Sequence, residues 1–257
     1  KQLADVRDKF GKPRMTQLIY TEDVVAYDED DHVENFPVKL VLSHDGYFKK
    51  ITLQSFRMSE EQAMKSGDEL LLVEDAENIS ELLFVSDKQK IYKAKVSDFE
   101  TKKSSVLGDY IPAKLGFEDG ERVMTVKAIT SYEPNHHFVY IFENGRGIRV
   151  PISSYETKSA RKKLVNAYSD VSPLVGAFYE TEPFDLLLVN SGGKAIYINT
   201  ELIPEKATRT AAGAQLFAMK ETQKLTCATR TPETNYTGFE KCRKTKLPAT
   251  GSSVAKK

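Results

Sequence analysis

The chain contains no tryptophan and only two cysteines among its 257 residues. Cys227 and Cys242 are too few for a disulfide framework, and they lack the paired CxxC spacing of a zinc site. No apolar run approaches the roughly 20 residues that a membrane-spanning helix needs, and the N-terminal residues lack the pattern of a signal peptide. These absences favour a cytoplasmic protein with no membrane partner.

Catalytic motifs are also missing. The four histidines form no HExxH, there is no GxSxG elbow and no P-loop, and GRGIRV at 145–150 lacks the third glycine of a dinucleotide fingerprint. His136 and His137 are adjacent, but two histidines alone do not make a metal site. We therefore expect no catalytic residue, no metal and no cofactor in this chain.

An excess of charge of one sign is absent as well, because 37 Lys and Arg balance 37 Asp and Glu. The net charge therefore gives no indication of a nucleic-acid partner. The distribution is uneven, however. Acidic residues are concentrated at 22–34, whereas 158–163 and 241–246 are locally basic. A DNA-binding surface would have to be one face of a polarised molecule.

An internal repeat is the main feature that is present. The segments 40–56, 82–99, 139–155 and 186–203 each read as an apolar strand, a polar turn, a second alternating strand and a final aromatic or apolar residue. Turn residues that tolerate positive φ occur at Asp45-Gly46, Asn144-Gly145 and Gly192-Gly193, while the second copy has Lys88-Gln89 instead. We expect the final residues to be core: Phe56, Phe99, Tyr155 and Ile203.

Units of about 40–50 residues with about four strands each are typical of a propeller-like fold. We therefore predict an all-β disc of four to five blades, and the absence of tryptophan excludes a WD40 array. Short helices are expected at 1–12 and 59–65. The predicted repeats lie near 38–80, 81–130, 137–183 and 184–232, with a partial last blade at 236–248 that strand material near 19–25 could complete, and a disordered tail at 249–257.

Three phrases carry a family resemblance. HDGYFKKITLQSF at 44–56, NGRGIRVPISSYETKSARKKLVNAYSD at 144–170 and SGGKAIYINTELIPEKATRTAAG at 191–213 resemble the repeats in the C-terminal domain of the A subunits of bacterial gyrase and topoisomerase IV. Residues 1–18 resemble the end of the preceding breakage-reunion domain, or a linker. Because the sequence opens on Lys1 within such a segment, we expect it to be a piece of a longer protein.

The resemblance implies a β-pinwheel over 19–248, in which blades exchange strands with their neighbours and duplex DNA bends around a basic rim. It also implies that the strand-cleaving tyrosine, the magnesium carboxylates and the ATPase lie elsewhere in a type IIA topoisomerase. The implied partners are duplex DNA, an ATPase B subunit, and the rest of the A subunit. The fragment itself would be non-catalytic, with ATP and magnesium used elsewhere in the holoenzyme.

Gyrase carries a box rich in Gln, Arg and Gly in its first repeat, where this chain reads FRMSEEQAMKSGDE at 56–69. This departure favours a topoisomerase IV-like enzyme that relaxes and decatenates DNA. Two alternatives stay open. One is a gyrase with a degenerate box, and the other is a propeller-like scaffold for protein partners, with the acidic stretch at 22–34 as its docking element.

Basic residues recur after each hairpin turn and in the links that follow, as a continuous phosphate-binding track requires. If 6 to 10 phosphates are neutralised, binding should weaken by about 10³ to 10⁵ between 50 and 200 mM salt. The predicted DNA-binding residues are Lys49, Lys50, Lys90, Lys93, Lys95, Arg146, Arg149, Lys158, Arg161, Lys162, Lys163, Lys194 and Arg209.

Overall fold

The computed structural model describes residues 2–12, 33–59, 61–157, 161–231 and 234–256. It divides the chain into two units, Lys1–Val33 and Glu34–Lys257. In the first unit, α1 (Gln2–Phe10) confirms the predicted N-terminal helix and buries none of its residues. The proposed boundary at residue 19 and the strand suggested near 19–25 lie outside the described residues.

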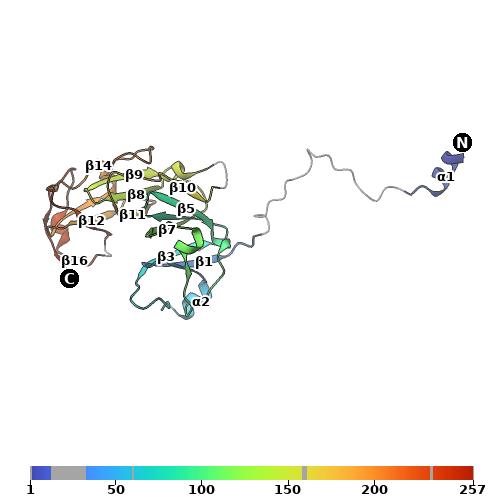
Figure 1. Ribbon diagram of the computed structural model, residues 1–257, viewed down its shortest axis with the longest axis horizontal. Coiled ribbons are helices and arrows are strands. Elements are labelled where there is room, and N and C mark those ends of the chain that lie inside the picture. Colours follow the sequence, from blue (N-terminus) through green and yellow to red (C-terminus); the bar gives the residue numbers. More distant parts are fainter. Residues whose placement is uncertain (1, 13–32, 60, 158–160, 232–233, 257) are drawn as a thin grey trace. The chain divides into compact units, whose positions relative to one another are not determined.

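The second unit is built from four antiparallel sheets of four strands each, which we name blades A to D (Figure 1). This arrangement confirms the predicted all-β, propeller-like fold. Blade A has the order β3 (Leu70–Glu77), β1 (Pro37–Ser43), β2 (Tyr47–Thr52) and β6 (Asp109–Tyr110). Blade B has the order β7 (Val123–Ile129), β4 (Glu81–Ser86), β5 (Lys90–Lys95) and β10 (Lys163–Val165).

The other two blades repeat this plan. Blade C has the order β11 (Leu174–Glu180), β8 (His137–Phe142), β9 (Arg146–Pro151) and β14 (Ala214–Gln215). Blade D has the order β15 (Leu225–Arg230), β12 (Asp185–Asn190), β13 (Lys194–Asn199) and β17 (Ser252–Ser253). A two-stranded sheet of β16 (Tyr236–Thr237) and β18 (Ala255–Lys256) completes the pairing.

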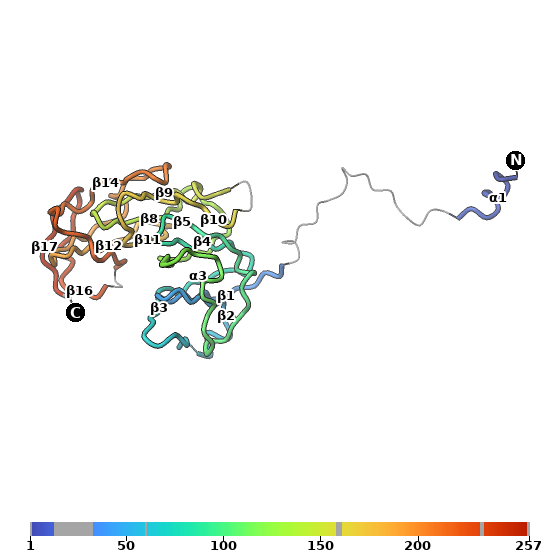
Figure 2. Tube along the Cα trace, in the orientation of Figure 1, coloured from blue at the N-terminus to red at the C-terminus, as the bar shows by residue number. Residues whose placement is uncertain are grey.

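Strand exchange links successive blades. The first three strands of each blade come from one repeat, and in blades A to C the fourth comes from the connection after the next hairpin (Figure 2). In blade D the fourth strand, β17, comes from the C-terminal segment after η6. For example, β6 follows the β4–β5 hairpin of blade B in sequence but pairs with β2 of blade A, with Tyr47 opposite Tyr110. The exchange that the family resemblance implied is therefore present in this chain.

Short helices follow the second strand of each hairpin. In the first repeat this helix is α2 (Leu53–Met58), in which the Ser55 N–H donates to Thr52 Oγ1 at 3.2 Å. The helix predicted at 59–65 is wrong, because α2 ends before Ser59 and the described residues from 61 to 65 are not helical. The others are η3 (Val96–Asp98), η4 (Ile152–Tyr155) and η5 (Thr200–Leu202). Two further short helices lie elsewhere: α3 (Ile111–Leu115) between β6 and β7, and η6 (Phe239–Cys242) between β16 and β17.

The hairpin turns use the left-handed backbone region as the sequence predicts. Gly46, Gly145 and Gly193 have φ values of 88°, 76° and 69°. In the second copy Gln89 takes the same conformation, with φ of 53°, which is uncommon for a residue with a Cβ. The next connection holds Gln89 there, because the Ala167 N–H donates to the Gln89 carbonyl at 2.9 Å and the Tyr168 hydroxyl accepts from the Gln89 N–H at 3.1 Å.

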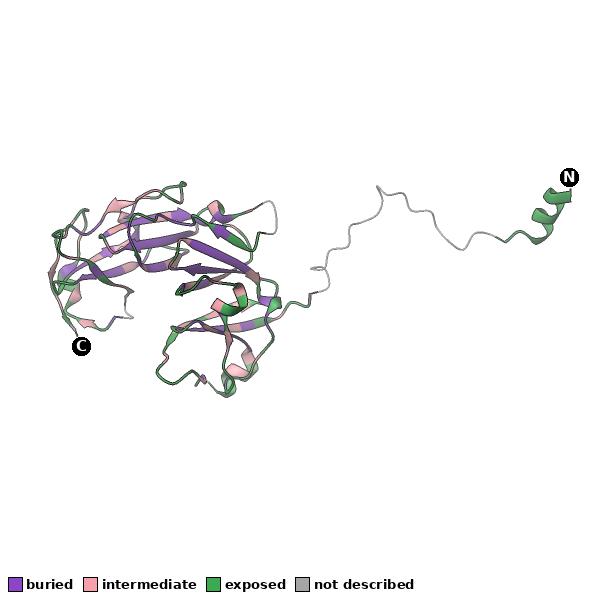
Figure 3. Cartoon of the chain, in the orientation of Figure 1, coloured by how far each residue is buried: buried purple, intermediate pink, exposed green. Residues whose placement is uncertain are grey.

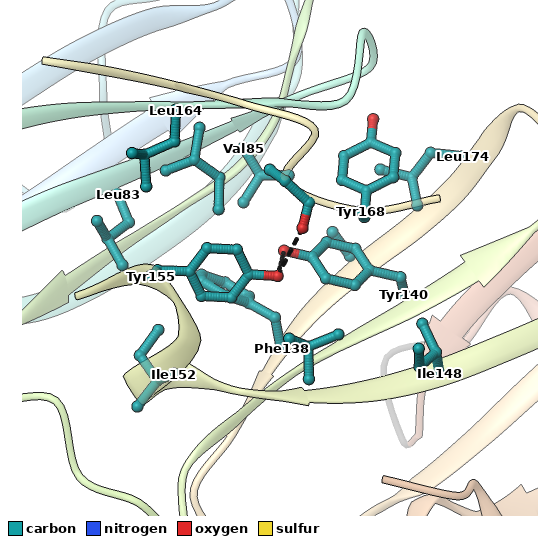
Figure 4. Close-up of a cluster of buried hydrophobic side chains, with 14 of the residues drawn as sticks. Leu83, Val85, Phe138, Tyr140, Ile148, Ile152, Tyr155, Leu164, Tyr168 and Leu174 are labelled. Atoms are coloured by element: carbon teal, nitrogen blue, oxygen red, sulfur yellow. Dashed lines mark hydrogen bonds between the residues drawn. The ribbon is translucent and has the colours of Figure 1, made fainter. Parts of the chain in front are cut away.

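Apolar cores fill the spaces between neighbouring blades, so the hairpin strands are buried on both faces (Figure 3). Between blades A and B, the Phe48 ring lies 5.2 Å from Phe84 and 4.8 Å from Phe99. Between blades B and C, the Tyr140 and Tyr155 hydroxyls are hydrogen-bonded at 3.0 Å within the core drawn in Figure 4. Between blades C and D, side chains of β8 and β12 form a third core with Phe217.

The residues that end each repeat fulfil most of the core prediction. Phe99, Tyr155 and Ile203 are each at most 1% exposed. Phe56 is only half-buried, and the Lys39 ammonium lies 5.5 Å from its ring centre. The first repeat differs because the described residues include no preceding blade that would cover this side chain.

The two terminal blades are covered by local segments instead of a fifth blade. Helix α2 packs on β1 and β2, and η6 packs on β13. The predicted partial blade at 236–248 is therefore a cover on blade D, with Cys242 buried against Leu187 and Val189. The prediction of a disordered tail is wrong for residues 252–256, because β17 pairs with the open edge of β13 and β18 pairs with β16.

Candidate nucleic-acid interface

Lys49 and Lys50 lie inside blade A and do not project into solvent. Their exposed fractions are 4% and 5%. The Lys49 ammonium donates to the Ala63 and Ser104 carbonyls at 3.0 and 3.1 Å, and the Lys50 ammonium donates to Asn78 Oδ1 and the Val96 carbonyl at 2.9 and 3.0 Å. Burial lowers the pKa of both ammonium groups. The prediction that these side chains line a solvent-facing rim is wrong.

Two lysines of blade B are also buried within ion pairs. Lys90 lies 2.5 Å from Glu118 and 3.3 Å from Glu121. Lys93 lies 3.5 Å from Glu81 and donates to the Tyr132 hydroxyl at 2.5 Å. Because carboxylates and a hydroxyl already satisfy both ammonium groups, neither is placed to neutralise a phosphate, and the rim prediction is wrong for them too.

The arginines of blade C are half-buried and engaged within the fold. Arg149 lies 2.7 Å from the buried carboxylate of Glu180. Arg146 donates to the Gly213 carbonyl at 3.2 Å and to Gln215 at 3.4 Å. Their guanidinium groups therefore bind groups of blade C and of its exchanged strand, and a contact with DNA stays a prediction for both.

These recurrent cations share one structural position. Lys50, Lys93 and Arg149 each occupy the fourth residue of the second hairpin strand. At this position the backbone also bonds to the connection from the next repeat. The Lys102 N–H donates to the Lys50 carbonyl at 2.8 Å, and the Lys206 N–H donates to the Arg149 carbonyl at 2.9 Å. The backbone at this position therefore pairs with the exchanged connection, while the basic side chains bond to groups of the hairpin blades, such as Asn78 for Lys50 and Glu180 for Arg149.

Blade D has Tyr197 at the equivalent position and a different polar cluster. The Tyr197 hydroxyl donates to Asp185 at 2.7 Å, Asn199 donates to the same carboxylate at 2.9 Å, and Arg243 does so at 3.0 Å. Burial raises the pKa of Asp185, but the hydrogen bonds from these three residues outweigh it, so the pKa lies below its ordinary value. Arg243 belongs to the connection that crosses onto blade D.

Replacing Asp185 by alanine is expected to lower the free energy of unfolding by about 2 kcal/mol, because charged hydrogen bonds are lost and donors are left unpaired. A lowered folded-state pKa means that the carboxylate stabilises the fold above its unfolded pKa of about 3.9 and that this contribution is lost as pH falls through the folded value. Urea titrations should therefore give a constant difference from wild type between about pH 5 and 8 that shrinks below about pH 4. Asp170→Ala, at an exposed position, is the control; equal losses in the two variants would contradict the assignment.

Exposed basic residues instead gather on the four connections that exchange strands, which we name the exchanged connections: 100–108, 156–166, 204–213 and 243–251. Each carries at least two lysines or arginines, at least one of them exposed, while Lys102, Arg209 and Lys244 are half-buried. Several of them are not among the predicted DNA-binding residues, although basic residues recur in the sequence after the aromatic or apolar residue that ends each repeat. The unassigned residues are Lys102, Lys103, Lys206, Arg243, Lys244 and Lys246.

The second exchanged connection brings three predicted residues together. Arg161, Lys162 and Lys163 are consecutive and exposed. Lys163 also lies 3.4 Å from Glu118, while its ammonium sits 5.4 Å from the ring centre of Tyr92. Lys158 lies outside the described residues.

The remaining predicted residues are more scattered. Lys95 and Lys194 are exposed at the end of β5 and the start of β13, respectively. Arg209 is half-buried on the third exchanged connection, with its guanidinium 5.6 Å from the ring centre of Tyr155.

The exchanged connections lie at the outer edge of the blades. Strands β3, β7, β11 and β15 line a shared central cavity of about 730 Å³. The exchanged strands β6, β10, β14 and β17 lie at the opposite end of each four-stranded sheet. Radial repetition therefore sets the basic connections on one common edge.

Other types of site find no support in the described part of the chain. No group of three His, Cys, Asp or Glu side chains there is arranged to hold a metal ion. None of the helices described is long and apolar enough to span a membrane. Cys227 and Cys242 lie in one cluster on blade D and are not joined in a disulfide.

Comparisons with known proteins agree with this architecture. The family described as "DNA gyrase C-terminal domain, beta-propeller" matches residues 80–130, 143–166 and 185–226. The A subunit of DNA gyrase from Thermotoga maritima is 24% identical over 63% of this chain and 20% of its own length. The A subunit of DNA topoisomerase 4 from Streptococcus pneumoniae is 23% identical over 86% of this chain and 28% of its own length.

A solved structure is similar in fold. The crystal structure of the C-terminal domain of DNA topoisomerase IV superposes with a TM-score of 0.67 at 21% identity, covering 79% of this chain and 64% of that one. The chain thus spans less than a third of the two curated relatives. Both gyrase and topoisomerase IV proteins are among those to which it is similar.

Proposed function

We propose that this chain, which belongs to the DNA gyrase C-terminal domain family of β-propellers, binds duplex DNA along its exchanged connections and bends it. The observation that carries the proposal is the recurrence of exposed lysines and arginines at the outer edge of every blade. Phosphates are spaced densely along a duplex, so cations repeated around a curved edge gain affinity by releasing condensed counterions. Sequence specificity is not needed for this mode of binding.

The parent protein we propose is the A subunit of a type IIA topoisomerase. The chain would present a DNA segment to the strand-passage core, which an ATPase B subunit together with another part of the A subunit would supply. ATP and magnesium would be used there, in the cytoplasm, and this chain would contribute binding without catalysis. The residues 56–69 in place of a gyrase box support topoisomerase IV-like relaxation and decatenation rather than negative supercoiling.

The test is binding of the isolated chain to duplexes of about 20 and 60 base pairs whose ends carry a donor and an acceptor fluorophore, since smooth bending becomes feasible over this range. At 50 mM salt we expect binding to both, tighter on the longer duplex after correction for the number of binding positions, with increased energy transfer. Binding without increased transfer would contradict bending. Absence of binding would overturn the DNA proposal and favour a scaffold for protein partners.

A further inference from the structure

A chain of polar side chains crosses the central cavity and joins three blades. Glu74 comes from β3 of blade A, Lys127 from β7 of blade B and Tyr179 from β11 of blade C. All three line the cavity of about 730 Å³. Their strands β3, β7 and β11 are labelled in Figure 1. We name this group the hub chain.

The contacts within the hub chain are close and partly buried. The Lys127 ammonium forms an ion pair with the Glu74 carboxylate, and it lies 4.8 Å from the ring centre of Tyr179. The Tyr179 hydroxyl is hydrogen-bonded to Nδ1 of His136 at 2.9 Å. The side chains of Lys127 and Glu74 are 25% and 11% exposed.

Burial dominates the electrostatics of this group. It raises the pKa of the Glu74 carboxyl, even though Lys127 acts in the opposite direction. Burial also raises the pKa of Tyr179 to about 12, so the phenol stays neutral near pH 7. A partly buried ion pair of this kind adds little net stability compared with apolar residues of the same size, because desolvation offsets the attraction.

Its contribution to geometry is different. Apolar side chains make up most of the cores between the blades, apart from hydroxyl groups such as those of Tyr140 and Tyr155, and apolar contacts are not directional. The hub chain contacts are directional, since an ion pair and a cation on a ring face are restricted in distance and position. A single ammonium group that contacts blades A and C from blade B restricts both angles between neighbouring blades.

We propose that Lys127 is a positioning residue that fixes the angles between blades A, B and C, and thereby the curvature of the outer edge along which DNA would lie. The effect on the path of DNA rests on the proposed function, whereas the effect on the angles between the blades does not. The inner strands line the central cavity, and the exchanged strands lie at the opposite end of each sheet. A small change in the angle between two blades at the cavity therefore moves the exchanged strands by a larger distance.

The test compares Lys127→Met, which keeps most of the length of the side chain and removes its charge, with Arg122→Met as a control. Arg122 lines the same cavity, but its ion pair at 3.3 Å is with Asp87 of the same blade. Nitroxide labels would replace the exposed residues Gln54 and Ser153 in blades A and C, with Cys227 changed to serine. Double electron–electron resonance then measures the distance between the two labels in the absence of DNA, and this distance changes with the angle between blades A and C.

We expect Lys127→Met to shift and broaden the distance distribution, whereas Arg122→Met leaves it as in wild type. On duplex DNA, Lys127→Met should lower the energy transfer between the duplex ends without a matching loss of affinity. An unchanged distance distribution would overturn the inference. Failure of the wild-type chain to bind DNA would remove the proposed function, while the distance measurement would still decide the role of Lys127.

Glu74→Gln provides a second variant if Lys127→Met does not fold. The amide keeps a hydrogen-bond acceptor for Lys127 and removes the charge that burial disfavours. We expect thermal stability moderately below wild type, because the partly buried Lys127 ammonium is left without a counter-charge, together with a broadened distance distribution. Equal stability with an unchanged distribution would show that the pair sets no angle and would overturn the inference.

Discussion

Charge reversal at Arg161 and Lys162 is expected to weaken duplex binding by roughly 50-fold at 0.1 M salt, since each phosphate contact contributes about 0.9 to the slope of log affinity against log salt. Both side chains are exposed on the second exchanged connection. Arg161→Glu/Lys162→Glu should also flatten that slope by about 2. Gel-shift titrations of wild type and variant from 50 to 200 mM salt measure both quantities.

The matched control carries the same change in charge at positions outside the exchanged connections. Lys88 and Lys220 are exposed in turns, and Lys88→Glu/Lys220→Glu alters the net charge equally. If binding depends on the outer edge, this control should lose much less affinity. Equal losses in the two variants would mean that overall charge, and not a track on the exchanged connections, determines binding.

The sequence was sufficient to predict the hairpins and their repetition. Alternation, turn glycines and the spacing of the repeats each indicated four similar units, and the first three strands of every blade fall within one predicted repeat. Even the departure at Lys88-Gln89 marks a place where Gln89 adopts the conformation of the missing glycine. These signals are local, so the hairpins can be predicted from them without knowledge of the tertiary contacts.

The direction of the hairpin cations could not be predicted in the same way. Alternation tells which residues share a face of a strand, but β2 is buried on both faces, between the next blade and α2 with its following loop. Lysine is rarely buried unless its ammonium is paired. The partners of Lys49, at Ala63 and Ser104, are distant in sequence, so no local sequence pattern predicts these hydrogen bonds.

The exchanged strands could not be predicted from the sequence for a related reason. In blades A, C and D the fourth strand is only two residues long, which is too short to produce a pattern of alternation. It exists because a neighbouring blade offers an open backbone edge. The small, polar residues 249–257 therefore suggested disorder, although Ser252–Ser253 pairs with Lys194–Ala195.

Lys50→Glu is expected to lower the free energy of unfolding by about 3–5 kcal/mol, the range for leaving buried charge unpaired. The substituted carboxylate would face Asn78 Oδ1 and the Val96 carbonyl, two acceptors that now bind the ammonium. Urea unfolding followed by circular dichroism measures this loss. Lys103→Glu, at an exposed position of the first exchanged connection, should change stability by less than about 0.5 kcal/mol.

The variants Lys50→Glu and Lys103→Glu also distinguish a role in the stability of the fold from a role in DNA binding. At temperatures where both variants remain folded, Lys50→Glu should retain the wild-type affinity for duplex DNA per folded molecule, because its side chain lies beneath the surface. Lys103→Glu should lose affinity and flatten the salt dependence by about 1. The opposite pattern, in which Lys50 affects binding and Lys103 affects only stability, would return the phosphate-binding track to the hairpins and contradict its placement on the exchanged connections.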